Sequence, residues 1–304
     1  MQSIAVVGSG AVGTYYGGRL AAGGEDLRFL MRSGRQEVGE RGLHVESVAG
    51  GFVVERPRLF ATAEEIGPVD LVVVAWKATS NHHFGEVLPP LLHDRTAILT
   101  LQNGLGNTER LAELFGAERV LGGLCFVCIN RLGPGHIRHT AKGLVTLGEF
   151  AGGESARVRG LEQRFTAAGI ECRVVDDLAA AQWAKLVWNV PFNGLCIAAG
   201  GITTRELLAQ EGGEGEVRAL MEEVIAGAAV GLRVPRDMID PQIESTYAMG
   251  AYRPSSMIDF VEGREVEVEA IWEEPLQRAR GAGADLPHWE RLLARIKRRL
   301  AERP

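Results

Sequence analysis

The sequence predicts two domains, an α/β domain over residues 1–176 and an all-α domain over residues 177–304. A chain of 304 residues is longer than one hydrophobic core usually serves. Its first half alternates short apolar runs, typical of strands, with helical patterns, which favours a parallel sheet covered by helices. After Asp177 the strand-like runs stop and helical periodicity dominates, so we place the boundary between residues 176 and 177.

The first predicted strand ends in a glycine-rich turn. The apolar run Ile4–Val7 leads into Gly8-Ser9-Gly10-Ala11-Val12-Gly13, and a helical pattern begins at Ala11. In a dinucleotide-binding turn the first glycine permits the tight turn, the second lets a pyrophosphate approach and the third lets helix and strand pack closely. The helix N-terminus then offers N–H groups to the phosphates. A chance glycine-rich turn is the alternative, but the position after a first strand favours a Rossmann fold with a nucleotide site.

The end of the second predicted strand indicates which nicotinamide cofactor binds. This strand, Leu27–Met31, ends at Arg32, and no acidic residue stands between Leu27 and Gln36. An NAD-specific site has an acidic residue there, about 20 residues beyond the glycines, to hold the ribose hydroxyls. A guanidinium suits a 2′-phosphate instead, so we expect NADP(H) bound through Arg32; an ordinary surface arginine is the alternative.

Two later strands also end in polar residues. The strand Leu71–Ala75 is followed by Trp76-Lys77, and the strand Ala97–Leu101 is followed by Gln102-Asn103-Gly104. Ligands of open α/β sheets bind outside the carboxyl ends of the strands, which places Lys77 near the cofactor. The amide of Asn103 both donates and accepts, which suits a residue that contacts nicotinamide and substrate together; an Asn that only begins a turn is the alternative.

The first helix predicted in the second domain carries a polar stripe. Lys185, Asn189 and Asn193 fall at i, i+4 and i+8 and share one face, while their neighbours are mostly apolar. A buried polar group without a partner costs about 1–3 kcal/mol, so we expect the stripe to face polar ligands. In the structural alternative the lysine reaches the surface and the asparagines bond to backbone.

Composition and charge exclude several other classes of protein. The net charge of -6 argues against a nucleic-acid partner. The basic stretch Arg291–Arg303 has its apolar residues on one helical stripe and predicts the exposed face of a terminal helix. Cys125 and Cys128 form the only C-x-x-C in the sequence, and no second pair completes a metal site. No signal-peptide pattern or long apolar run is present, so we expect a soluble cytoplasmic protein without a membrane partner.

Taken in order, these motifs resemble the ketopantoate reductase (2-dehydropantoate 2-reductase) family. The resemblance also includes Ser255-Ser256-Met257 and Gly263-Arg264 with Glu267, and it covers nearly the whole chain. It implies a helical domain like the C-terminal domain of 6-phosphogluconate dehydrogenase. It further implies NADPH-dependent reduction of 2-dehydropantoate to (R)-pantoate, a step of pantothenate and coenzyme A biosynthesis, in the cleft between the domains.

The resemblance also assigns roles to the candidate residues. It implies that Lys185 is the proton donor and that Asn103 touches both nicotinamide and substrate. Glu267 would contact the cofactor and support the lysine. The residues that would hold the substrate are Asn189, Asn193 and Ser256. The alternation of Glu and Val around Glu267 by itself predicts a half-buried strand, whereas the resemblance implies a helix, and we expect the helix.

The chain departs from the family pattern at two points, and other functions stay open. Thr203, which with Glu206 also fits a capping box, stands where a further substrate asparagine is expected, and the segment from Ser256 to Glu267 is one residue shorter. The chain is therefore either a 2-dehydropantoate reductase or a family member acting on another 2-keto acid or carbonyl compound. A non-enzymatic NADP(H)-binding redox sensor is the alternative from another class, although a sensor needs no buried lysine–glutamate pair. The oligomeric state stays open, a homodimer included.

Overall fold

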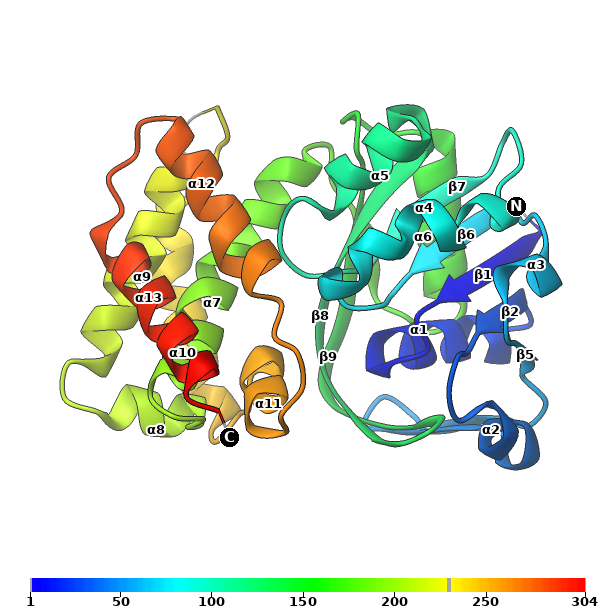
Figure 1. The fold of residues 1–304 in the computed structure, drawn as a ribbon, viewed down its shortest axis with the longest axis horizontal. Helices are drawn as coiled ribbons and strands as arrows, with labels where there is room; N and C mark the ends of the chain where they lie inside the picture. Colours follow the sequence, from blue (N-terminus) through cyan, green and yellow to red (C-terminus); the bar gives the residue numbers. More distant parts are fainter. Residues whose placement is uncertain (1, 229–230, 304) are drawn as a thin grey trace. The chain divides into compact units, whose positions relative to one another are not determined.

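The computed structural model describes residues 2–228 and 231–303, and this chain divides into two units (Figure 1). The first unit comprises residues 1–102 and 107–178, and the second comprises residues 103–106 and 179–304. The predicted boundary at residues 176 and 177 lies close to the passage from one unit to the other. The loop Asn103–Gly106, however, groups with the helical unit. Among the described residues, the helices lack the length and apolarity that a membrane span needs.

The first unit is built on a mixed sheet that, over the described residues, has ten strands. The strands are β1 (Ser3–Val7), β2 (Asp26–Leu30), β3 (Leu43–Ser47), β4 (Phe52–Val54), β5 (Arg58–Phe60), β6 (Leu71–Val74), β7 (Ala97–Thr100), β8 (Val120–Gly133), β9 (His136–Glu149) and β10 (Cys172–Val174). Their order is β4-β3-β9-β8-β7-β6-β1-β2-β5, with β10 paired to β9. The neighbours from β7 to β5 pair in parallel, as the α/β prediction requires.

Helices cover both faces of this sheet. They are α1 (Ala11–Ala22), α2 (Arg35–Arg41), α3 (Ala63–Ile66), η1 (Ala78–His83), α4 (Phe84–Val87), η2 (Pro89–Leu91), α5 (Asn107–Phe115), η3 (Ala117–Arg119) and α6 (Ala156–Ala167). Ile4 and Val6 pack with side chains of α1 and α6, whereas Ala5 and Val7 pack with side chains of α3, α4 and α5. Figure 1 shows α1 and α4 on opposite sides of the strands. The predicted Rossmann-like first domain is confirmed.

The sequence pattern predicts some strands incompletely. We predict no strand at β3, β4 or β5, although Leu43-His44-Val45-Glu46 alternates apolar and polar residues. Pieces are predicted at residues 120–129, 137–139 and 144–147, where the structure has the long antiparallel pair β8 and β9. Register shifts interrupt this pair at three places, from Phe126 to Gly133. At each register shift the side chains that follow change to the opposite face of the sheet. The apolar and polar residues therefore do not alternate regularly along the whole strand.

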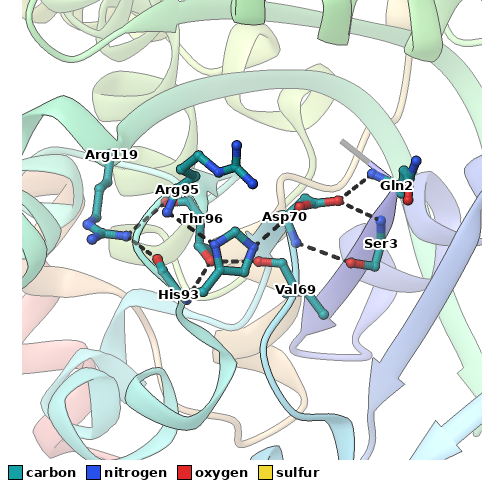
Figure 2. A network of polar contacts seen from close by, with 8 residues as sticks. All are labelled: Gln2, Ser3, Val69, Asp70, His93, Arg95, Thr96 and Arg119. Carbon is teal, nitrogen blue, oxygen red and sulfur yellow. Dashed lines mark hydrogen bonds and ion pairs between the residues drawn. The ribbon is translucent and has the colours of Figure 1, made fainter.

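The amino ends of three parallel strands are tied together by a polar network (Figure 2). Asp70, which precedes β6, accepts hydrogen bonds from the backbone N–H groups of Gln2 at 2.5 Å and Ser3 at 3.2 Å, beside β1. These bonds lower the pKa of the Asp70 carboxyl below its usual value. His93 lies 3.3 Å from Asp70, and its backbone N–H donates to the Thr96 hydroxyl just before β7. Because ligands bind at the opposite, carboxyl ends of parallel strands, this Asp–His pair has a structural role.

All regular secondary structure among the described residues of the second unit is helical, which confirms the predicted all-α domain. Its helices are α7 (Leu178–Ala198), α8 (Thr204–Ala209), α9 (Gly213–Ala228), η4 (Arg236–Met238), α10 (Ile239–Met249), α11 (Ser255–Val261), the π-helical turn η5 (Glu269–Glu273), α12 (Glu274–Gly281) and α13 (Pro287–Ala301). Most of the second half of α7 lies in the core of this unit. In α13, Leu292 and Ile296 are buried while arginines such as Arg295 form surface ion pairs, as predicted for the basic C-terminal stretch.

Candidate active site

The glycine-rich turn has the geometry expected of a dinucleotide site. Gly8 has φ +102°, and a Cβ there would lie 2.3 Å from the Trp76 backbone nitrogen. A Cβ on Gly13 would lie 2.1 Å from the Gly8 carbonyl oxygen, so both glycines are required by the protein's own packing. A Cβ on Gly10, in contrast, would meet no described atom within 4 Å. Space is therefore open at the glycine that is expected to face a pyrophosphate.

The residues after Gly10 present backbone donors. Gly10 is the N-cap of α1, and because it has no side chain it cannot cap the N–H groups of the first turn. The N–H groups of Ala11, Val12 and Gly13 therefore suit an anionic ligand. The Ser9 hydroxyl donates to the carbonyl of Leu30 at 2.9 Å, which ties the turn to the end of β2. Ser9 would therefore contact a phosphate through its backbone.

Arg32 and Lys77 lie at the same edge of the sheet as the glycine turn. Arg32 follows β2 and is exposed, and Lys77 follows β6 and is half-buried. Because β6, β1 and β2 are adjacent and parallel, the three chain segments leave the sheet side by side. Two cations next to an open glycine turn fit a cofactor that carries several phosphates.

Lys185 and Asn103 form a close pair in the helical unit. The Lys185 ammonium donates to the side-chain oxygen of Asn103 over 2.8 Å. Lys185 is only 8% exposed, so it does not extend to the surface as the structural alternative requires, although the other half of that alternative, an asparagine bonded to backbone, is met at Asn193. The ammonium can only donate, which identifies the Asn103 atom as its oxygen and leaves the amide NH₂ directed elsewhere. The pair thus combines an acidic proton with an amide donor for a carbonyl compound.

The lower part of the polar stripe meets the start of α11. Asn193 is 2% exposed, and its side-chain oxygen accepts from the backbone N–H of Ser256 at 2.9 Å. The Ser256 hydroxyl is buried and has no hydrogen-bond partner among the described residues. Asn189, one turn before Asn193, is also buried. A buried hydroxyl without a partner costs free energy, so a ligand oxygen near Ser256 would be stabilised there.

Glu267 is buried but lies in neither of the elements predicted for it. It belongs to an irregular segment, and the helix begins one residue later, at Val268. Burial does not alternate here, because Val266 and Glu267 are both buried while Glu265 is exposed. The strand predicted from alternation is therefore wrong, and so is the helical position implied by the resemblance. The carboxylate at 6% exposure remains a candidate partner for a cation or a ligand hydroxyl.

Thr203 has a structural explanation. It is the N-cap of α8, and the predicted capping box is confirmed: Glu206 N–H donates to the Thr203 hydroxyl at 3.3 Å, and Thr203 N–H donates to the Glu206 carboxylate at 2.7 Å. The bonds from Thr203 lower the pKa of the Glu206 carboxyl. The hydroxyl of Thr203 is thus used within the helix cap.

The cysteines are reduced thiols in apolar surroundings. Cys125 and Cys128 are buried in β8, and burial raises the pKa of Cys172 and of Cys196 to about 12. Such thiols are poor nucleophiles at neutral pH. No group of His, Cys, Asp and Glu side chains suited to a metal ion occurs among the described residues.

Two contacts beside the Lys185–Asn103 pair involve residues that the sequence pattern does not identify. The backbone N–H of Leu105 donates to the carbonyl of Ala270 at 2.8 Å, and the indole N–H of Trp272 donates to the carbonyl of Val190 at 3.0 Å. Backbone carbonyls leave no trace in a residue pattern. The two glycines of the loop Asn103–Gly106 are the only local signal that the backbone comes close to another segment there.

Known proteins are similar to this chain over nearly its whole length. Residues 4–152 match the family described as "Ketopantoate reductase PanE/ApbA", and residues 177–300 match "Ketopantoate reductase PanE/ApbA C terminal". A 2-dehydropantoate 2-reductase from Nostoc sp. is 39% identical over 302 residues, which cover 97% of this chain and 94% of the relative. The crystal structure of the 2-dehydropantoate 2-reductase from Geobacter metallireducens GS-15 superposes with a TM-score of 0.95 at 43% identity, covering 97% of this chain and 99% of the other. The crystal structure of the 2-dehydropantoate 2-reductase from Methylococcus capsulatus has a TM-score of 0.89 at 32% identity, covering 97% of this chain and 96% of the other.

Proposed function

This chain belongs to the ketopantoate reductase family, and we propose that it reduces 2-dehydropantoate to (R)-pantoate with NADPH, in pantothenate and coenzyme A biosynthesis. Family membership makes it an oxidoreductase that acts on CH–OH donors. The observation that carries the substrate proposal is the buried contact of 2.8 Å between Lys185 and Asn103. A keto-acid reductase needs a proton donor held beside a group that recognises the carbonyl, and this pair supplies both.

Lys185 serves as the acid of the reaction. When bound, the nicotinamide cofactor would supply a hydride for the carbonyl carbon of the keto acid, so negative charge would develop on the carbonyl oxygen. The Lys185 ammonium stabilises that charge and transfers a proton to the oxygen, which completes the alcohol. Asn103 keeps the ammonium in place and directs its amide NH₂ to the same substrate.

Asn189, Asn193 and Ser256 hold the substrate. The Asn193 oxygen is engaged by Ser256 N–H, so its NH₂ group is the donor for a substrate oxygen. The buried Ser256 hydroxyl is a second donor, and the two suit the carboxylate or hydroxyl of 2-dehydropantoate. Glu267 contacts the cofactor and supports Lys185 in this scheme. Fixing the substrate before chemistry lowers the entropic part of the barrier.

The cofactor in this proposal is NADP(H), held by the glycine turn Gly8–Gly13 with Lys77 and Arg32. The open space at Gly10 and the N–H groups at the start of α1 suit the pyrophosphate. The exposed guanidinium of Arg32, after β2, suits the 2′-phosphate. No carboxylate takes that position in the sequence, which supports NADP(H) over NAD(H).

A panel of 2-keto acids assayed with NADPH tests the function. Oxidation of the cofactor is followed by its nicotinamide absorbance, with NADH as a second cofactor in each assay. We expect 2-dehydropantoate to give the highest kcat/KM, at least about tenfold above the other acids, since one misplaced group in a pocket costs roughly 1–3 kcal/mol. A higher kcat/KM for another keto acid would assign a different substrate. NADPH binding without turnover of any compound would instead favour the redox sensor.

A further inference from the structure

The helix that follows Glu267 contains an unusual turn. Residues Glu269–Glu273 form the π-turn η5, and the N–H of Glu274 donates to the carbonyl of Glu269, five residues back. A regular α-helix would direct that N–H to the carbonyl of Ala270. π-turns are rare in proteins, but those that occur inside helices are often located at functional sites.

The π-turn leaves the carbonyl of Ala270 without its usual helical donor. Its α-helical donor, Glu274 N–H, goes to Glu269, and the residue five positions further on is Pro275, which has no N–H. Ala270 is buried, so its carbonyl needs another donor. The donor is the backbone N–H of Leu105, 2.8 Å away, in the loop that begins with Asn103.

The loop is fitted closely to this carbonyl. Gly104 has φ +83°, and a Cβ there would lie 2.2 Å from the Ala270 oxygen. The Leu105 side chain is buried in the core of the helical unit. The loop is therefore fixed by a backbone hydrogen bond, a position that only glycine fits and an apolar anchor.

The same π-turn is attached to the helix that carries Lys185. The indole of Trp272, fully buried, donates to the carbonyl of Val190 in α7 at 3.0 Å. A Cβ on Gly194 would lie 2.8 Å from that indole nitrogen, so α7 and the π-turn pack closely. One turn of helix thus contacts both the Asn103 loop and the Lys185 helix.

We propose that the π-turn η5, created with the help of Pro275, positions Asn103 against Lys185. Ala270, through its carbonyl, and Trp272, through its indole, set the separation of the loop from α7, and Gly104 permits the close fit. These are positioning residues, because they act on the reaction through Asn103 and Lys185. This inference rests on the proposed function, in which that pair acts on the substrate.

Pro275→Ala is the sharpest test. Alanine restores an N–H that can bond to the Ala270 carbonyl and compete with Leu105 N–H. Losing one hydrogen bond of ordinary strength corresponds to a decrease of about fivefold in kcat, with the NADPH dissociation constant unchanged. Pro287→Ala, at the first turn of α13 and exposed, is the matched control and should leave kcat unchanged.

Two further measurements separate positioning from a general loss of structure. In an Asn103→Ala background, Pro275→Ala should have no additional effect on kcat, because the residue it positions is gone. Hydrogen exchange at the Leu105 amide should be faster in Pro275→Ala than in the wild type, and this readout needs no substrate. Multiplicative losses in the double variant, or unchanged exchange at Leu105, would overturn the proposal. If the wild type does not reduce 2-dehydropantoate but the Leu105 amide still exchanges faster in Pro275→Ala, only the proposed function is refuted.

Discussion

Replacing Lys185 by methionine is the most direct test of the chemistry. Methionine has a similar length and no charge, so it fills the space in α7 while it removes the proton donor. The side chain is 8% exposed, so bulk water has little access to take over its role. The contact that disappears is the 2.8 Å hydrogen bond to Asn103.

The expected loss follows from the role of the ammonium. Proton transfer by a positioned acid contributes about 10²–10⁴ to the rate, so the barrier should rise by roughly 3–5 kcal/mol. Stability should change little, because losing a donor for Asn103 costs about 1–3 kcal/mol while burying methionine instead of an ammonium is favourable. Folding and NADPH binding should therefore survive while kcat falls at least about 100-fold.

Single-turnover reduction of 2-dehydropantoate by the NADPH-loaded enzyme measures this loss without a contribution from product release. NADPH affinity is measured separately, by fluorescence without substrate. The matched control is Lys142→Met, which makes the same change at an exposed lysine of β9. A rate within about threefold of the wild type, with NADPH affinity intact, would remove Lys185 from the mechanism.

Three further predictions address cofactor, substrate and stability. Arg32→Glu should weaken NADPH binding at least about tenfold and shift preference toward NADH, whereas Arg95→Glu, at the amino end of β7, should change neither affinity; equal losses for both cofactors would show that the 2′-phosphate is held elsewhere. Asn193→Ala should raise KM for the keto acid and lower the free energy of unfolding by about 1–3 kcal/mol, since the buried N–H of Ser256 loses its acceptor; urea unfolding and steady-state kinetics measure the two effects, and an unchanged KM would exclude substrate contact. His139 is 1% exposed, and burial lowers the pKa of its imidazole. As the pH falls, His139 is therefore protonated in the unfolded chain before it is protonated in the folded protein. Its contribution to stability should be complete above about pH 6.5 and should decrease as the pH falls toward the lower pKa of the folded state. Stability is measured as the urea midpoint at a series of pH values, and the decrease at acidic pH should be absent in His139→Gln. The same decrease in wild type and variant would show that other groups cause it.

The sequence predicts well the features that depend on short-range spacing. The glycine turn follows from six consecutive residues, and the common face of Lys185, Asn189 and Asn193 follows from helical geometry alone. The capping box at Thr203 is also local, and the structure has it as predicted. In each of these cases the residues concerned lie within eight positions of one another along the chain.

Features that depend on distant segments were less accessible. Glu267 illustrates the limit, since the alternation around it has the strand period while its surroundings place two consecutive residues in the core. The hairpin of β3 and β4 is stable because β3 also pairs with β9, far along the chain. Such pairings override local propensity, and a short alternating run cannot reveal them.

The π-turn shows why a site can be assigned and still be incompletely understood from its sequence. Lys185 and Asn103 are residues whose chemistry suggests a role, and family resemblance brings them together. Their alignment, however, depends on a carbonyl that becomes available because Pro275 lacks an N–H and because the helix shifts its hydrogen bonds by one residue. The residue type at Ala270 carries no chemical signal, because the contact is made by its backbone carbonyl, whereas Gly104 and Pro275 should be sensitive to substitution. The geometry of catalysis in this protein therefore depends on backbone groups as much as on the side chains that perform it.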